Sequence, residues 1–480
     1  MLIKPQKGFY NVDPVSGEFL SSAIFDGYLD EFNALCSRFG LVEFTDLATG
    51  FPGDGLFWWD KSDFPIAVSG GQCFKFDSAG SLTELTGGNF NTGTQATFAD
   101  GQKVDNSAFL YACNGAKLNY STGGNFTQAG VPAPQTCSHV VYNGLRFLAN
   151  EVGTARFYFT DVNPADNEFD PTYWAAIENP LTSDSRGDNI LGMYPTWDDV
   201  AIWGTQSREI WQVTGSSPPL QPRLGSLCEA GLVAPYSVQN ADNTIFALCI
   251  VDKKLAVVRL LGNDPVIISL DIEKILDGFH TFNDAIGDVV SVGGQSFYII
   301  TFPTEDQTWA YNIKKKEWYQ WSWWKTIPAK RGAFIGRNFI YAKSWGKHFC
   351  QSRLDGKIYE VIPEAKTDDG NTIKTEWQTG WLDGGTSKNK TMPFMRFHMR
   401  RGEGILGTDE PVIAFKYRDN GSRVWKNERQ VGLGNTGEYE FYRRVNGLGM
   451  FRTRQMSIIL TDAAKLVLAD LDVEIKRLGN

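Results

Sequence analysis

Histidines and closely spaced carboxylates are the side chains of this chain that suit acid–base or metal chemistry. The four histidines share no metal-ligand spacing: His139, His280, His348 and His398. Two acid pairs, Asp161 with Asp166 and Asp198 with Asp199, are of the type that glycosidases place on either side of the bond they cleave. Their sequence neighbours are turn formers, which favours exposed turn acids. We therefore predict no catalytic residue and no metal ligand.

A stretch near the C-terminus imitates a motif of carbohydrate-active proteins. Asp419-Asn420-Gly421 supplies residues that tolerate positive φ in a tight hairpin turn, and the flanking residues alternate between apolar and polar. Asp419, Gly421 and Trp425 resemble the Asp box of sialidases, but the tryptophan stands one place too far along. A carbohydrate-active or carbohydrate-binding β-propeller is therefore the alternative interpretation of this chain.

Aromatic side chains gather between Trp318 and Trp324, directly after three lysines at 314–316. Such a cluster suits the stacking of bases or sugars, but large rings also pack between the sheets of a propeller, and we favour packing. The chain has no P-loop, no nucleophile elbow and no glycine-rich strand–helix motif. We therefore predict a protein that is not an enzyme and needs no cofactor.

Charge is unevenly distributed along the chain, whose net charge is −9. Residues 367–480 carry 18 Lys and Arg against 15 Asp and Glu, which leaves 28 against 40 in residues 1–366. Avid binding of duplex DNA requires clustered cations that displace counterions. The acidic part is therefore not expected to hold DNA.

Cysteine usage and hydrophobic runs indicate where the chain folds. The seven cysteines are scattered, odd in number and without a Cys-x-x-Cys pair, which predicts reduced, buried thiols and folding in the cytoplasm. The N-terminus has no apolar signal core, and no run approaches the ~20 residues of a membrane span. We expect no membrane span.

A repeating pattern of short apolar strands and polar turns begins at Phe51-Pro52-Gly53. Strand pairs recur every ~40–55 residues, a period typical of propeller blades. First strands are predicted at 56–59, 108–112, 145–150, 200–203, 245–249, 297–301 and 339–343. Second strands are predicted at 73–76, 117–120, 156–160, 210–213, 255–259, 307–312 and 358–361. Six or seven blades fit this pattern; a pair of sandwiches or a solenoid remains open.

The predicted fold is all-β, with three segments. Residues 1–50 form an N-terminal segment, in which Tyr28 to Phe39 show helical spacing that also suits a strand. Residues 51–366 form the β-propeller, interrupted by a short helix from Asp271 to Gly278. Residues 367–480 form a β-sandwich platform, or interface domain.

Several segments resemble the tail hub proteins of short-tailed bacteriophages, also called packaged-DNA stabilisation or nozzle proteins. No single motif is diagnostic, but their order and spacing together are specific, and the likeness covers roughly residues 45–480. The similar segments are Phe51-Pro52-Gly53, 157–161, 169–180, 188–193, 197–215, 272–275, 451–454 and 473–475.

The resemblance implies a structural virion protein of the phage tail that folds and assembles in the host cytoplasm. Members of this family form a hexameric tube below the portal and its head-to-tail adaptor, and packaged double-stranded DNA passes through it without sequence-specific binding. Further partners implied are a tail fibre or tailspike and a tail tip, needle or plug. Arginines of the C-terminal segment are expected at subunit interfaces, since the planar guanidinium suits pairing with carboxylates: Arg396, Arg400, Arg401, Arg443, Arg444, Arg452 and Arg454.

Overall fold

The computed structural model describes residues 1–8, 10, 19, 21–103, 105–175, 180–183, 187–196, 198–262, 264–325, 328–399, 410–426, 428–433, 443–462, 464 and 466–477. In this part of the chain nearly all regular structure is β-strand, which confirms the all-β class. The helical elements are η1 (Pro235–Ser237), η2 (Leu270–Ile272) and α1 (Glu273–Leu276). The helix expected after Asp271 is therefore present and ends before Gly278.

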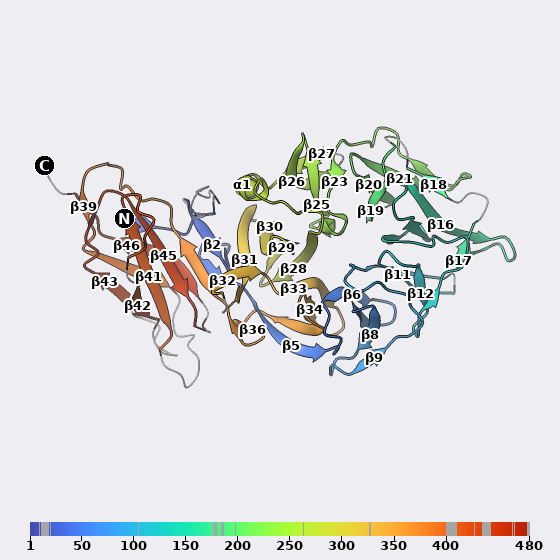
Figure 1. Cartoon of the computed structure of the whole chain (residues 1–480), viewed down its shortest axis with the longest axis horizontal. Helices are drawn as coiled ribbons and strands as arrows, with labels where there is room; N and C mark the ends of the chain where they lie inside the picture. The colour runs from blue at the N-terminus through green and yellow to red at the C-terminus, as the bar shows by residue number, and fades with distance from the viewer. Residues whose placement is uncertain are drawn as a thin grey trace.

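Seven sheets of the described chain surround one axis as blades (Figure 1). The first blade consists of β6 (Gly53–Trp59), β7 (Phe64–Ser69), β8 (Gln72–Phe76) and β9 (Leu82–Glu84). The second consists of β10 (Thr97–Gln102), β11 (Ala108–Cys113), β12 (Asn119–Ser121) and β13 (Thr127–Gln128). The third consists of β14 (Val140–Asn143), β15 (Arg146–Asn150), β16 (Arg156–Asn163) and β17 (Glu168–Trp174), with β18 (Leu181–Thr182) beside β16. Each is an antiparallel meander whose first strand lies nearest the axis.

The next three blades repeat this order. The fourth blade consists of β19 (Ile190–Thr196), β20 (Asp199–Gly204), β21 (Arg208–Val213) and β22 (Leu220–Pro222). The fifth consists of β24 (Gln239–Ala241), β25 (Thr244–Val251), β26 (Lys254–Leu261) and β27 (Asp264–Ile267), with β23 (Gly231–Leu232) beside β25. The sixth consists of β28 (Ile286–Val292), β29 (Gln295–Phe302), β30 (Gln307–Asn312) and β31 (Glu317–Lys325), with β32 (Lys330–Ala333) beside β31.

The seventh blade takes its outer strand from the other end of the chain. β33 (Gly336–Ala342), β34 (Lys347–Ser352) and β35 (Lys357–Ile362) are followed by β5 (Gly40–Asp46), which pairs antiparallel to β35. Two short strands, β36 (Thr367–Asp368) and β37 (Asn371–Thr372), continue this sheet. The N-terminal segment thus closes the ring of blades.

Apolar side chains fill the spaces between neighbouring blades. Val68 of β7 and Leu110 of β11 lie in one buried cluster, and Leu148 and Ile202 lie in another two blades further on. Burying such a side chain contributes roughly 1.5–3 kcal/mol. Trp318 and Trp321 of β31 are fully buried, so these two rings pack the core as we favoured, whereas Trp323 and Trp324 are only partly buried.

The remaining strands form what we call the C-terminal unit, defined as β1–β4 together with β38–β47. One of its sheets runs in the order β2 (Ala23–Phe25), β38 (Thr375–Gln378), β45 (Arg454–Leu460), β41 (Val412–Asp419), β42 (Arg429–Gly432), and continues into the sixth blade because β2 also pairs with β31. The other is β3 (Gly27–Leu29), β4 (Leu35–Ser37), β46 (Val467–Val473), β40 (Phe394–Met399), β43 (Arg443–Asn446), with β1 (Leu2–Ile3) beside β46. A small sheet joins β44 (Met450–Phe451), β39 (Lys390–Thr391) and β47 (Lys476–Arg477).

Both larger sheets of the C-terminal unit contribute to one buried core. Trp377 and Ile458 come from the first sheet, and Phe397 and Leu471 come from the second. The same cluster includes Phe297 of the sixth blade. The C-terminal unit and the ring of blades therefore share apolar core.

Residues 28–39 form a hairpin of β3 and β4, so the helical interpretation of this segment is wrong and the strand alternative is correct. Asp30 Oδ1 accepts the backbone N–H groups of Phe32 and Ala34 and thereby holds the turn. Phe32 is 88% exposed at that turn. A tight turn between two buried strands reproduces the apolar spacing of a helix, which explains the error.

The turn at Asp419-Asn420-Gly421 also differs from expectation. Asn420 and Gly421 do adopt positive φ. However, the next strand, β42, begins only at Arg429, so the connection is longer than the tight hairpin that the sequence predicts.

Buried ion pairs join the C-terminal unit to the ring of blades. Asp26, which follows β2, accepts a hydrogen bond from Arg38 Nε at 3.1 Å and from the backbone N–H of Ser322 at 2.6 Å, and also pairs with Arg331. Arg331 pairs at 3.1 Å with Glu376 of β38. Burial opposes ionisation of Glu376, but Arg331, the Gln378 hydrogen bond and two nearby lysines together outweigh burial and lower the pKa of that carboxyl to about 2.

Candidate functional site

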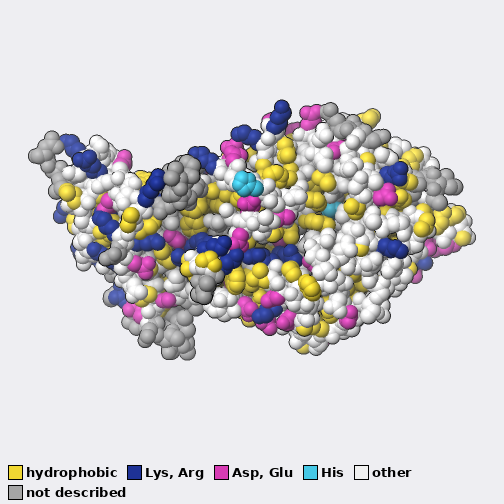
Figure 2. Space-filling view, in the orientation of Figure 1, with side chains coloured by type: hydrophobic (Ala, Val, Ile, Leu, Met, Phe, Trp, Pro, Cys, Tyr) yellow, Lys and Arg dark blue, Asp and Glu magenta, His cyan; other side chains and the backbone are white. Residues whose placement is uncertain are grey.

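The outward face of the second C-terminal sheet carries three charged side chains and one aromatic ring that we together call the arginine face: Arg444, Arg396, Asp472 and Phe394. Along β40 the side chains of Met395 and Phe397 enter the core. Since side chains alternate along a strand, Phe394 and Arg396 lie on the opposite, solvent side. Figure 2 shows Lys and Arg side chains over the C-terminal unit and its junction with the blades, and fewer over the blades on the right.

Arg396 and Arg444 stand directly opposite each other on β40 and β43. Both guanidinium groups lie over the ring of Phe394, at 4.9 Å and 3.9 Å from its centroid. Asp472 lies 3.9 Å from Arg396, which is 42% exposed, and Arg444 is exposed. Two like charges placed opposite each other across a sheet repel. An acidic surface docked here would relieve that repulsion.

The other expected interface arginines lie in different surroundings. Arg443 pairs with Glu410 and donates to the Gly432 carbonyl oxygen at 3.0 Å. Arg452 is exposed and donates to Asn389 Oδ1 at 3.2 Å. Arg400 and Arg401 lie outside the described residues.

Arg454 is fully enclosed in its own chain. Its Nε and Nη2 donate to the two carboxylate oxygens of Asp419 at 2.7 and 3.1 Å. The guanidinium lies between the rings of Tyr417 and Phe451, at 4.1 and 4.2 Å from their centroids. This arginine holds β41 to β45 and offers no surface to a neighbouring chain.

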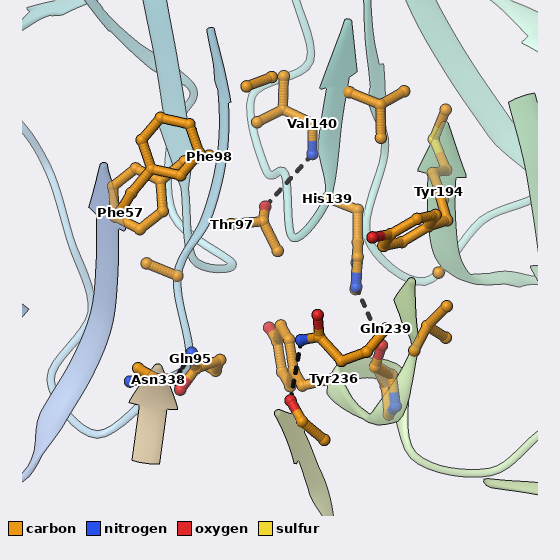
Figure 3. Close-up of a pocket in the computed structure, with 18 of the residues that line it drawn as sticks. Phe57, Gln95, Thr97, Phe98, His139, Val140, Tyr194, Tyr236, Gln239 and Asn338 are labelled. Atoms are coloured by element: carbon orange, nitrogen blue, oxygen red, sulfur yellow. Dashed lines mark hydrogen bonds between the residues drawn. The ribbon is translucent and has the colours of Figure 1, made fainter. Parts of the chain in front are cut away.

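A cavity of about 540 Å³ lies on the axis of the blades, and we call it the central cavity. Every blade contributes lining residues, from β6, β10, β14, β19, η1 with β24, β28 and β33. Figure 3 shows Phe57, Phe98, His139, Tyr194 and Tyr236 around it, together with the polar side chains of Gln95, Thr97, Gln239 and Asn338. Sequence reasoning missed these residues, because they come from seven blades far apart in the sequence and several of the side chains are polar.

The residues that suggested acid–base or metal chemistry are dispersed in the structure. Asp161 pairs with Arg146 at 2.7 Å, and Asp199 pairs with Arg223 at 3.0 Å. Among the described residues no group of three or more His, Cys, Asp or Glu is arranged to hold a metal ion. All seven cysteines are thiols outside any disulfide and are buried, as predicted. No helix among the described residues is long and apolar enough to cross a membrane.

The all-β ring of blades and the family-like segments agree with the comparison to known families. The model of a family described as "Bacteriophage P22 Gp10, beta-propeller" matches residues 11–366. The chain belongs to this family of phage packaged-DNA stabilisation proteins, which are components of the virion tail. The expected β-propeller and the resemblance to tail hub proteins are thereby confirmed.

Solved structures give only distant likenesses. The extracellular domain of a putative hybrid two component system from B. thetaiotaomicron matches with a TM-score of 0.40 and 9% identity, over 92% of this chain and 61% of that one. The Neurospora crassa Pan2 WD40 domain matches with a TM-score of 0.40 and 8% identity, over 70% of this chain and 98% of the other. A search of the curated proteins found no match.

Proposed function

We propose that this chain is the tail hub, or nozzle, subunit of a short-tailed phage, and that six copies form a ring below the portal and adaptor. In this proposal the C-terminal unit is a β-sandwich platform that contacts neighbouring copies and the adaptor. The propeller carries fibres or tailspikes, and the tip of the tube accepts a needle or plug. The finding that carries the proposal is membership of the tail family together with the exposed Arg396–Arg444 pair outside the propeller.

The charge of the chain supports a role as a wall for passing DNA. Residues 1–366 carry an excess of Asp and Glu over Lys and Arg, 40 against 28. A basic wall would bind phosphates and release counterions, which would retard the polymer. An acidic surface instead lets duplex DNA pass without sequence-specific binding.

The arginine face supports a protein contact. Guanidinium groups suit bidentate pairing with carboxylates, and electrostatic complementarity sets orientation and partner choice at interfaces. Arg396 and Arg444 are held in position by Phe394, so less side-chain entropy is lost when a partner docks. The acidic balance of residues 1–366 provides suitable complementary surface on a second copy of the chain.

Charge reversal of the arginine face tests this proposal. Arg396→Glu/Arg444→Glu should remain folded, since both side chains are on the surface, but should fail to form a ring on the portal–adaptor complex of the same phage. The matched control is Arg156→Glu/Arg223→Glu, which changes two exposed blade arginines (57% and 59%) by the same charge. Circular dichroism measures folding, and native mass spectrometry with negative-stain microscopy measures assembly.

The control variant is expected to assemble like the parent chain. A doubly reversed arginine face that still forms rings would remove the proposed contact. A parent chain that stays monomeric on the portal–adaptor complex would overturn the hexamer itself.

A further inference from the structure

The central cavity has the walls of a ligand site. Its volume of about 540 Å³ lies within the range of small-molecule pockets, roughly 300–1,000 Å³. The lining side chains Phe57, Thr97, Phe98 and Tyr236 are only partly buried, so their faces are open to the hollow. The tail function of the chain does not account for this arrangement.

Two aromatic pairs form opposite parts of the wall (Figure 3). Phe57 and Phe98 are stacked with ring centroids 5.3 Å apart and an angle of 15° between their planes. His139 and Tyr236 are stacked at 5.2 Å and 16°. Stacking fixes the ring orientations, so the pocket presents preformed flat apolar surfaces. The C–H face of a ring-shaped ligand fits against such surfaces.

Amide and hydroxyl groups stand between these aromatic surfaces. Gln95 Nε2 donates to Asn338 Oδ1 at 2.5 Å, and Gln239 Nε2 donates to the Gly287 carbonyl oxygen at 2.8 Å. Gln95 Oε1 is buried and accepts no hydrogen bond from the described residues. A buried acceptor without a partner costs about 1–3 kcal/mol. Because Gln95 lines the cavity, a rotation of this amide that brings Oε1 to a ligand hydroxyl would remove that cost.

The charge of the wall excludes anions. No residue that lines the cavity in the described chain is Lys or Arg, whereas Asp100 and Asp288 both line it. His139 is neutral at physiological pH because burial lowers its pKa to about 4. Phosphates and carboxylates would meet acidic groups and no cation. The wall therefore disfavours anions, and its amides and rings suit a ligand that is rich in hydroxyl groups and flat enough to stack.

We propose that the central cavity binds a neutral saccharide of one or two rings, with its C–H faces against Phe57, Phe98 and Tyr236. Gln95 and Gln239 supply hydrogen bonds to its hydroxyl groups. Because bidentate amides and stacked rings recognise stereochemistry, the site discriminates between epimers of one sugar. This activity is separate from ring assembly at the arginine face.

Saturation-transfer NMR and calorimetry on the purified full chain test the site. The probes are glucose, galactose, mannose and N-acetylglucosamine, together with maltose, lactose and chitobiose. At least one is expected to bind with a dissociation constant in the millimolar range or below. Inorganic phosphate, the anionic control probe, is expected not to bind.

Variants locate the binding. Gln95→Leu and Tyr236→Ala should each weaken the affinity at least tenfold, whereas Tyr341→Ala, which removes an exposed aromatic ring outside the cavity, should leave it unchanged. A thermal melt of each variant separates lost binding from lost folding, and Gln95→Glu serves as a second, nearly isosteric variant at the same position. Absence of binding by all seven sugars overturns the proposal. So does sugar binding that survives Gln95→Leu and Tyr236→Ala, since the ligand would then sit elsewhere.

Discussion

At the residue scale, the buried carboxyl of Asp288 in the wall of the central cavity shows how the fold tunes one group. Its Oδ1 accepts the backbone N–H of Phe339 at 3.1 Å. Burial raises the pKa of Asp288 from 3.8 to about 7, although this hydrogen bond and nearby Arg337 act in the opposite direction. The folded chain therefore holds a proton that the unfolded chain releases between about pH 4 and pH 7.

Asp288→Asn should make stability less dependent on pH. With the folded pKa above the unfolded value, the free energy of unfolding falls as pH rises from about 4 to 7, by up to about 1.4 kcal/mol per pH unit from this group. The asparagine carbonyl still accepts the Phe339 N–H, but the side chain cannot ionise. Urea unfolding at pH 5 and pH 8 measures the difference between parent and variant. Equal slopes with pH in the two chains would show that Asp288 is ionised throughout.

Two arginines of the C-terminal unit show when the burial of a side chain can be predicted from the sequence and when it cannot. Arg444 is exposed on a strand face, as an interface residue must be, and that follows from strand alternation alone. Arg454 is buried because the pairing of β41 with β45 brings it against Asp419. This partner lies 35 residues earlier in the chain. No local pattern carries that information.

At the element scale, the strands of the blades were predictable and their places within each blade were less so. Predicted strands at 108–112, 145–150 and 245–249 coincide with β11, β15 and β25, which are apolar and buried. Each is the second strand of its blade. The inner strands β10 and β24 carry polar residues that line the central cavity and β14 has only four residues, so hydrophobic periodicity does not detect these strands. The predictions at 56–59 and 339–343 do fall on the inner strands β6 and β33, but the other inner strands were not predicted, so the sequence did not reveal the cavity.

Elements from three parts of the chain meet at Asp26, and Asp26→Asn tests how strongly they are coupled. Among the described residues, the change leaves Arg38 with Asp368 as its one charged partner and Arg331 with Glu376. Breaking a buried ionic network costs about 3–5 kcal/mol. We expect a loss of this size in the free energy of unfolding, with faster hydrogen exchange in β2 and β38.

The control for this variant is Asp60→Asn, which removes an exposed ion pair with Lys343 at 2.6 Å. Exposed pairs contribute about 0–1 kcal/mol, so little change is expected. Equal effects of Asp26→Asn and Asp60→Asn would mean that the buried network does not hold the C-terminal unit to the blades.

At the scale of the whole molecule, strands from the N-terminal segment complete sheets that are otherwise formed by later parts of the chain. β5 closes the seventh blade, and β1–β4 complete the sheets of the C-terminal unit. A single apolar cluster runs from the sixth blade into both C-terminal sheets. A ring closed in this way cannot open at one blade without exposing the surfaces of its neighbours. We infer that the ring and the C-terminal unit unfold together.

Three cavity-forming substitutions test this cooperativity: Leu41→Ala in β5, Leu110→Ala in the second blade and Ile458→Ala in the C-terminal unit. All three side chains are fully buried, and such truncations cost about 2–5 kcal/mol. If the molecule unfolds as one unit, each variant lowers the same thermal transition, and tryptophan fluorescence and far-ultraviolet circular dichroism report the same midpoint. A chain in which Ile458→Ala splits the melt into two steps, while Leu110→Ala shifts only one of them, would instead contain two independently stable parts. In that case the shared cluster would be a contact surface between domains, and the arginine face could move relative to the blades during ring assembly.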